Sequence, residues 1–370
     1  MNEALKQSNT VTWLKGILPL LVVIIHTSHS ADLSCWESTE GFLRELFCVT
    51  GSLAVPVFFF ISGHYFFKGL GSWSWPAWGQ KLKKRLKTLL LPYLCWIAIA
   101  FVFKFISGYL HSEIASFDLA SVKSYFLSSG GLRMFYDQPV QDFSPTILGA
   151  DIIHTRPING PLWFVRDLMA MCVLAPLLFW LIRRGGRIFI GILAALFVLN
   201  IEIPVPGFSA SALLFFSAGA YFSINNRYFT VELKKIDRWS YILSIIFLCV
   251  IFALKATPYR LACEISCNMF AAIAAVAVIN LACALVTRNS VTECRLLTSS
   301  SFFIYAAHSL VMDFANFLLW RSLPFTAEWV LVLKVFLRPA VTVGLCLLIF
   351  VVMRKLFPRT LGVLTGGRFS

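Results

Sequence analysis

The chain has 370 residues, of which 58% are hydrophobic and only 14% are charged. An ordinary soluble domain is about one-quarter charged, so this composition excludes that class and indicates a membrane protein with several spans. The net charge of +14 does not indicate nucleic-acid binding, because the lysines and arginines are not gathered on a soluble domain that could lie along a duplex.

Ten apolar segments are long enough, with some tilt or shortening, to cross a hydrocarbon core of about 30 Å. We therefore predict an all-α polytopic membrane protein, a bundle of about ten transmembrane helices in which residues 1–370 form a single membrane-embedded domain. The predicted spans are residues 11–29, 47–67, 89–109, 161–182, 187–203, 207–224, 240–256, 261–286, 299–320 and 328–352.

The distribution of basic residues predicts the orientation of the bundle. With a cytosolic amino terminus, most of the 32 lysines and arginines fall in cytosolic segments, as the positive-inside rule requires. Both termini are then expected in the cytosol. The longest polar stretch, about residues 111–160, becomes an external loop, which we expect to be ordered. Such a loop can cap the bundle or gate an acceptor, and a simple connector is an equal alternative.

The first span carries Lys15 and, eleven residues later, His26. At about 100° per residue the two side chains project from one helix face, separated by roughly 16 Å along the axis. Ionisable groups at membrane depth usually face a bundle interior or a water-filled cavity, so this stripe is a candidate functional site. The alternative is that Lys15 reaches the headgroups and His26 lies hydrogen-bonded near the far surface.

The second span contains Pro56 and, six residues later, Ser62-Gly63 followed by His64. Proline and glycine inside a spanning helix free backbone groups and allow close approach. The pattern predicts a helix break beside a cavity. The alternative is a kinked helix that packs through small residues.

A basic run follows the second span, with five cations in the seven residues from Lys81 to Lys87. At the cytosolic surface these cations attract anionic lipid headgroups. They are equally suited to hold the phosphates of a nucleotide-like donor. The residues alone do not separate the two interpretations.

The fourth and ninth spans carry further polar groups. Arg166 and Asp167 are adjacent in sequence and point about 100° apart, so each is expected to find a partner on another helix. In the ninth span Tyr305 and His308 are three residues apart and share one face. For His308 the alternative to a functional role is a hydrogen-bonded packing group.

Cysteines and histidines do not indicate a metal site. Ten cysteines are present without a CxxC pair, and several lie in apolar helices as small hydrophobic residues. Cys35 and Cys48 are close enough in sequence at the outer edge to be considered for a disulfide. The histidines lack a supporting carboxylate cluster at ligand spacing, so we expect no metal.

Taken together, these segments resemble the acyltransferase family 3 integral membrane proteins, which transfer acyl groups to cell-envelope sugars. The resemblance covers nearly the whole chain, in order, and no single motif is decisive. One departure concerns the basic run, which in the family usually ends in Arg-x-x-Arg: here Arg85 holds the first position and Thr88 the second. The matching segments are Lys15 to His26, Val55 to Gly63, the basic run before Leu91-Pro92-Tyr93, Pro161 to Phe164 and Ser301 to His308.

The resemblance implies an O-acyltransferase of the bacterial inner membrane with acyl-coenzyme A, commonly acetyl-coenzyme A, as a cytosolic co-substrate and no permanently bound cofactor. The acceptor would be a hydroxyl of an envelope glycan or lipid-linked sugar, and the other partners would be membrane lipids. His26 is the expected general base, because histidine titrates near neutral pH. Lys15, Lys84, Arg85 and Lys87 are the expected donor-binding residues. Further candidates to line the site are Ser62, His64, Trp163, Arg166, Tyr305 and His308.

A transporter or flippase is the alternative function. A broken second helix together with intramembrane His26, Arg166 and His308 could line an ion or substrate path. Inverted repeats would favour this interpretation, and the sequence shows none.

Overall fold

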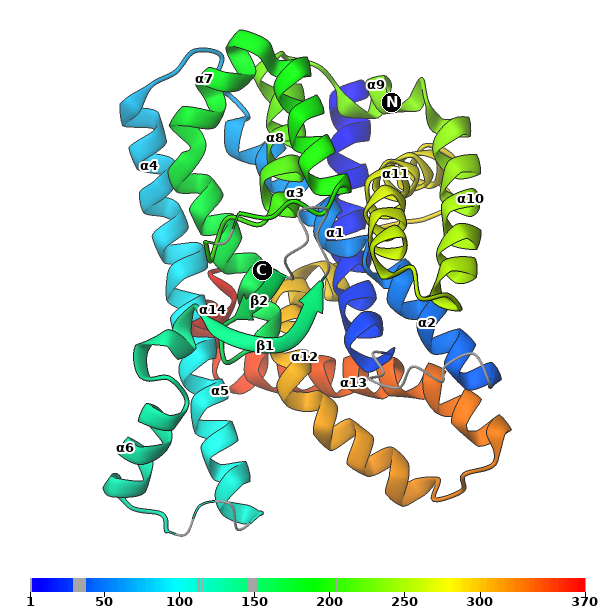
Figure 1. Ribbon diagram of the computed structural model, residues 1–370. Coiled ribbons are helices and arrows are strands. Elements are labelled where there is room, and N and C mark those ends of the chain that lie inside the picture. The colour runs from blue at the N-terminus through cyan, green and yellow to red at the C-terminus, as the bar shows by residue number, and fades with distance from the viewer. Residues whose placement is uncertain are drawn as a thin grey trace.

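The computed structural model describes residues 2–28, 38–111, 114, 116–144, 152–203 and 205–369. Long helices form one bundle (Figure 1), which confirms the predicted all-α membrane fold. The α-helices are α1 (Glu3–Ser28), α2 (Thr39–Gly51), α3 (Ala54–Phe67), α4 (Trp75–Arg85), α5 (Leu91–Leu110), α6 (Leu119–Ser128), α7 (Trp163–Val198), α8 (Ala210–Ile224), α9 (Phe229–Lys234), α10 (Asp237–Lys255), α11 (Arg260–Thr287), α12 (Arg295–Ser322), α13 (Glu328–Leu356) and α14 (Pro358–Thr365). The short elements are a π-helix η1 (Leu86–Leu90), the 3-10 helices η2 (Gly131–Phe135) and η3 (Gly160–Leu162), and the strands β1 (Gln138–Ser144) and β2 (Ile152–Arg156).

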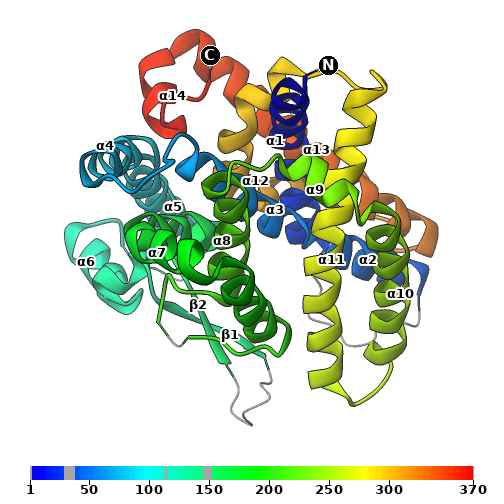
Figure 2. The same ribbon diagram turned by 90° about the horizontal axis from the view of Figure 1, so that it is seen from above.

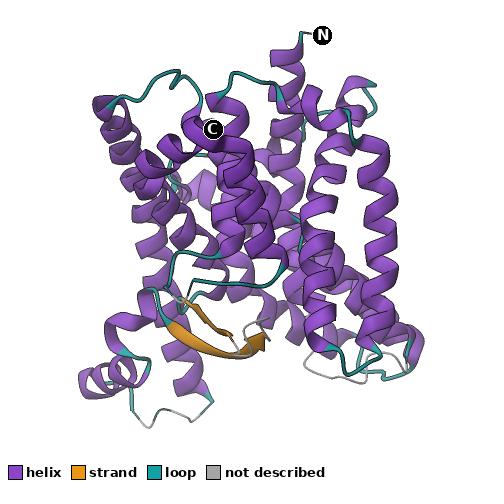
Figure 3. Ribbon diagram, turned by 45° about the horizontal axis from the view of Figure 1, so that its top comes forward, coloured by secondary structure: helices purple, strands orange, loops and turns teal. Residues whose placement is uncertain are grey.

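Among the described residues, eight helical stretches are long and apolar enough to cross a membrane. The predicted spans 161–182 and 187–203 lie together on α7, with a kink at Gly185, where φ is −145° and ψ is 40°. The predicted span 207–224 corresponds to α8, which has only 15 residues. Figure 3 shows both labelled chain ends in the upper half of the molecule and the strands in the lower half. The number of crossings and the cytosolic location of the termini stay predictions.

The break predicted between Pro56 and Gly63 is wrong, because α3 runs without interruption through this segment. The interruption lies earlier, between the end of α2 at Gly51 and the start of α3. Pro56 explains the shift. Its ring lacks the N–H that would donate to the Ser52 carbonyl and would clash with that carbonyl in a continuous helix. The helix therefore restarts just before the proline, which then lies in the first turn of α3.

Gly63 instead provides a helix–helix contact, as the small-residue alternative proposed. A Cβ built on Gly63 would lie 2.0 Å from the Phe216 carbonyl oxygen of α8, and one on Gly219 would lie 1.9 Å from the Phe60 carbonyl oxygen of α3. The two glycines therefore let the backbones of α3 and α8 touch directly. Such small-residue contacts are a common way to pack helices in lipid.

The described part of the segment between α5 and α7 contains regular secondary structure, and its location outside the cytosol stays a prediction. It holds α6, η2 and an antiparallel strand pair in which Gln138 faces Arg156. This hairpin departs from the purely helical expectation. Proline and polar residues along β1 do not suit a helix interior, and the paired strands satisfy each other's backbone groups.

Helix α1 occupies a central place in the bundle. It contacts α2, α3, α11, α12 and α13, and the view from above shows it among these helices (Figure 2). Side chains on several faces of α1 therefore point into protein. The suggested Cys35–Cys48 disulfide involves Cys35, which is outside the described residues.

Candidate active site

His26 of α1 and His308 of α12 lie in contact, with ring centroids 5.0 Å apart and ring planes inclined by 35°. The two helices run parallel and in register. Gly16 of α1 lies against Thr298 of α12, where an added Cβ would be 3.4 Å from the threonine hydroxyl. Ten residues later in each helix, the two histidines meet. Parallel packing agrees with the prediction that these helices are the first and the ninth of ten spans.

The surroundings of His308 determine which ring nitrogen carries its proton. Nδ1 lies 2.8 Å from the Tyr305 carbonyl oxygen, and because a carbonyl only accepts, Nδ1 is the donor. In the neutral ring Nε2 then holds a lone pair. His308 is fully buried, and Nε2 has no hydrogen-bond partner among the described residues. Leaving a buried polar atom unpaired costs free energy, so Nε2 is a candidate for a chemical role.

The segment before α7 is fastened to α12 beside His308. The Tyr305 hydroxyl donates to the Pro161 carbonyl. Asn159 Nδ2 donates to the Ala306 carbonyl at 3.1 Å, and the Ser309 hydroxyl donates to Asn159 Oδ1 at 2.9 Å. The side chain of Asn159 thus holds the segment before α7 against α12 on both sides of His308. No role was predicted for Asn159, although an asparagine before Gly-Pro at the start of a helix is a recognisable local signal.

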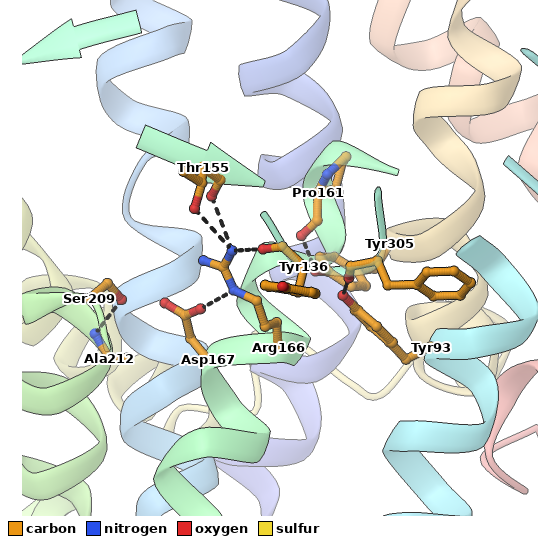
Figure 4. Close-up of polar contacts among 10 residues, drawn as sticks. Tyr93, Tyr136, Thr155, Pro161, Arg166, Asp167, Ser209, Ala212 and Tyr305 are labelled. Carbon is orange, nitrogen blue, oxygen red and sulfur yellow. Dashed lines mark hydrogen bonds and ion pairs between the residues drawn. The ribbon is translucent and has the colours of Figure 1, made fainter. Parts of the chain in front are cut away.

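Arg166 and Asp167 are paired with each other, with Arg166 Nε 2.8 Å from Asp167 Oδ1. The expectation that each finds its partner on another helix is therefore wrong for Arg166. Its guanidinium also donates to the carbonyls of Tyr136 and Thr155 in the segment between α5 and α7 (Figure 4). These residues lie in the first turn of α7, where the long arginine side chain can reach both its neighbour and the loop. Arg166 thereby fixes the hairpin to the bundle.

Trp163 and Ser62 are not part of the contact between the two histidines. Trp163 packs against α3, and Ser62 belongs to α3. The Trp163 ring is 6.2 Å from the ring of Phe59 on α3. Ser62 is half-buried on the next turn of the same helix. The rings of Phe164 and Tyr305 are 5.9 Å apart. Aromatic side chains of α3, α7 and α12 therefore contact one another beside the site.

His64 lies at the other end of the bundle. Its Nε2 is 3.1 Å from the Gln7 side-chain nitrogen, and Gln7 Oε1 accepts from the Phe229 backbone N–H. Gln7 precedes His26 by 19 residues on α1, which is roughly 28 Å along the helix axis. The contacts of His64 link the start of α1 to α3 and α9, and they do not bring it to His26.

The predicted donor-binding residues separate into two groups. Lys15 Nζ lies 5.1 Å from the centre of the Tyr65 ring, and Lys15 and Arg85 are close enough for their charges to interact. Arg85 is half-buried, whereas Lys84 and Lys87 are exposed. Lys15 is exposed as well. Lys15 and Arg85 therefore lie near each other, and Lys84 and Lys87 are separate exposed cations that lipid headgroups can reach.

In the described part of the chain, no group of three His, Cys, Asp or Glu side chains is placed to hold a metal ion. The chemistry open to the site is proton transfer. A histidine pair with one defined lone pair can accept a proton from a hydroxyl, and the cations near Lys15 can bind an anionic ligand.

Comparison with known proteins agrees with this geometry. A family model described as an acyltransferase domain (acyltransferase family 3) matches residues 9–353. The succinoglycan biosynthesis protein ExoH of Rhizobium meliloti (strain 1021) is 29% identical over 227 residues, which cover 59% of this chain and 54% of that protein. The chain thus spans about half the length of that relative. No solved structure matches this chain. Since the family model covers nearly the whole chain, this protein belongs to acyltransferase family 3 and is a multi-pass membrane protein.

Proposed function

We propose that the protein transfers an acyl group, most simply acetyl, from cytosolic acyl-coenzyme A to a hydroxyl of an envelope glycan or lipid-linked sugar. The observation that carries this proposal is the contact between His26 and His308, on the α1 face that also bears Lys15. The family supplies the reaction class, and the histidine pair supplies a place for the proton.

In the proposed reaction His26 removes the proton of the acceptor hydroxyl while the hydroxyl oxygen attacks the thioester carbonyl carbon. A carbon–oxygen bond forms, the carbon–sulfur bond breaks, and the proton passes from His26 to the departing thiolate. The products are the acylated sugar and free coenzyme A. His308 lies against His26 with its Nε2 lone pair available, so it can orient the base and stabilise the positive charge that the base acquires.

The spacing of charges along α1 suits a coenzyme A donor. Lys15 and His26 are separated by roughly 16 Å along the helix. The pantetheine arm is an amide chain about as long as four to five extended residues, and it reaches roughly 15 Å. A donor whose phosphates lie near Lys15 and Arg85 can therefore present its thioester to the histidine pair.

The acceptor is proposed to approach from the side of the external loop, in the inner membrane of a bacterium. Arg166 ties the hairpin to α7, and the segment before α7 lies beside His308. The relative is a protein of succinoglycan biosynthesis, which supports a polysaccharide or its lipid-linked precursor as the acceptor class. The family match favours an acyltransferase over a transporter.

Mass spectrometry of envelope glycans tests the proposal directly. Cells that produce the wild-type protein should show a mass increase of one acyl group that is absent without the protein. His26→Ala should lose this increase, because removing a general base costs roughly 10²-fold to 10⁴-fold in rate. His111→Ala, at an exposed histidine beyond α5, is the matched control and should retain acylation. Normal acylation by a folded, membrane-inserted His26→Ala protein would remove His26 from the mechanism.

A further inference from the structure

The segment after α13 folds back onto the bundle. Helix α14 contacts α5, and Trp96 Nε1 of α5 donates to the Leu364 carbonyl at 3.0 Å. The chain then turns at Gly366, where φ is +62°. A Cβ at this position would lie 2.4 Å from the Thr88 carbonyl oxygen. Glycine is therefore required both for the backbone angle and for close contact with η1.

This turn delivers the side chain of Arg368 into the basic region. Arg368 Nη2 donates to the Thr88 carbonyl at 2.9 Å. That carbonyl is available because Pro92, four residues later, has no N–H to donate. The guanidinium carbon of Arg368 also lies 4.9 Å from the centre of the Phe302 ring on α12. Arg368 thus bridges η1 and the helix that carries His308.

Arg368, Lys15 and Arg85 form a group of three mutually repelling cations. Gly16, the residue after Lys15, packs against α12 one turn before the ring that Arg368 contacts. Arg85 lies three residues before Thr88, whose carbonyl accepts from Arg368. These contacts place the three charges near one another. Burial, followed by the charge of Arg85, lowers the pKa of Arg368 to about 10. No carboxylate in the described ranges forms an ion pair with any of the three. Partly buried like charges are unfavourable unless an anion neutralises them.

We propose that Arg368 completes, with Lys15 and Arg85, a binding site for the phosphate groups of the acyl-coenzyme A donor. The inference rests on the proposed function and adds a residue from the opposite end of the chain. Arginine is suited to this task because its planar guanidinium binds phosphate through two parallel hydrogen bonds. A lipid phosphate offers the same chemistry. The donor is favoured because Arg85 and Arg368 are half-buried and Arg368 is held between η1 and α12, whereas Lys84 and Lys87 are exposed.

The test uses the full-length protein purified into lipid nanodiscs. Calorimetric titration gives the Kd of coenzyme A for the wild type, Arg368→Gln, Arg368→Lys and Arg359→Gln. Arg359 is an exposed arginine on α14 and serves as the matched control. Steady-state rates are measured with acetyl-coenzyme A and with acetyl-pantetheine, which contains the same thioester arm and no phosphate.

We expect Arg368→Gln to raise the Kd of coenzyme A and the KM of acetyl-coenzyme A by about 10-fold to 100-fold, as for the loss of a charge-assisted hydrogen bond. Its KM for acetyl-pantetheine should stay at the wild-type value, and Arg359→Gln should match the wild type throughout. Arg368→Lys keeps the charge and should show a smaller rise, so it provides the test if the glutamine variant does not fold.

Two results would overturn the inference while leaving the proposed function intact. One is an unchanged Kd for coenzyme A in Arg368→Gln. If less phospholipid also remains bound to this variant, the three cations bind lipid instead of the donor. The other is an equal rise in KM for acetyl-coenzyme A and acetyl-pantetheine, which would show a structural effect. Failure of the wild-type protein to bind coenzyme A at all would refute the proposed donor itself.

Discussion

The contact between His26 and His308 predicts that the two histidines act as a unit. Their ring centroids are 5.0 Å apart, and groups in contact show coupling energies of about 0.5–3 kcal/mol. We expect His308→Ala to cost an energy in the upper part of this range. That energy corresponds to a roughly 10-fold to 100-fold reduction in kcat/KM. His26→Ala should cost about 10²-fold to 10⁴-fold, which corresponds to about 3–5 kcal/mol of transition-state stabilisation.

The double variant distinguishes cooperation from independence. If His308 acts only through His26, it has nothing left to support once His26 is removed. The variant with both alanines should then be no slower than His26→Ala alone. The coupling energy from the cycle would equal the whole effect of His308→Ala. Two independent groups would instead show losses that multiply.

The assay is consumption of acetyl-coenzyme A by purified protein in nanodiscs, with an acceptor glycan present and with thermal unfolding measured for each variant. His308 is completely buried, so His308→Asn serves as a second variant that keeps a polar side chain and leaves a smaller cavity. A double variant whose loss equals the product of the single losses, with all proteins folded, would refute the idea of a cooperating pair.

Two further predictions concern stability. Gly63→Ala would place a methyl group 2.0 Å from the Phe216 carbonyl oxygen, so we expect a loss of about 1–3 kcal/mol and a lower Tm in detergent. Gly344→Ala meets no atom within 4 Å inside α13, so it should leave the Tm unchanged or raise it, because alanine favours a helix interior over glycine by about 1 kcal/mol. Equal Tm values for the two variants would contradict this packing. Burial raises the pKa of Glu202, in the loop before α8, to about 7, despite the hydrogen bond that its carboxylate accepts from the Ala210 N–H. Because the folded state holds this proton more tightly than the unfolded chain, stability from this group is present below a pH of about 4.5 and is lost as the pH rises through about 7. Glu202→Gln should therefore raise the free energy of unfolding at pH 8 by at most about 3 kcal/mol, seen as a higher Tm, and leave the Tm unchanged at pH 4. The same pH dependence of Tm in the wild type and in Glu202→Gln would contradict the raised pKa.

The class of the fold and the segments that carry the chemistry follow from the order of the amino acids alone. Hydropathy is a local property, so apolar runs of lipid length predicted helices that the structure contains. Helical spacing alone was enough to place Lys15 and His26 on one face. The ordered motifs also indicated the acyltransferase family, which the family model confirms. The position of the break near Pro56 could have been derived more closely, because the clash with the Ser52 carbonyl is itself local.

Contacts between residues far apart in the chain depend on how the helices pack. The register between α1 and α12 brings His26 to His308, and that register depends on packing at Gly16 and Thr298, which no local pattern reveals. The same holds for Arg368. It follows two glycines, so no periodic apolar pattern indicates where its side chain lies. Its place beside Thr88 depends on the docking of α14 onto α5. Hydropathy reports how strongly a segment prefers lipid. The relative rotation and order of the helices depend instead on side-chain shape and on hydrogen bonds between segments far apart in the chain.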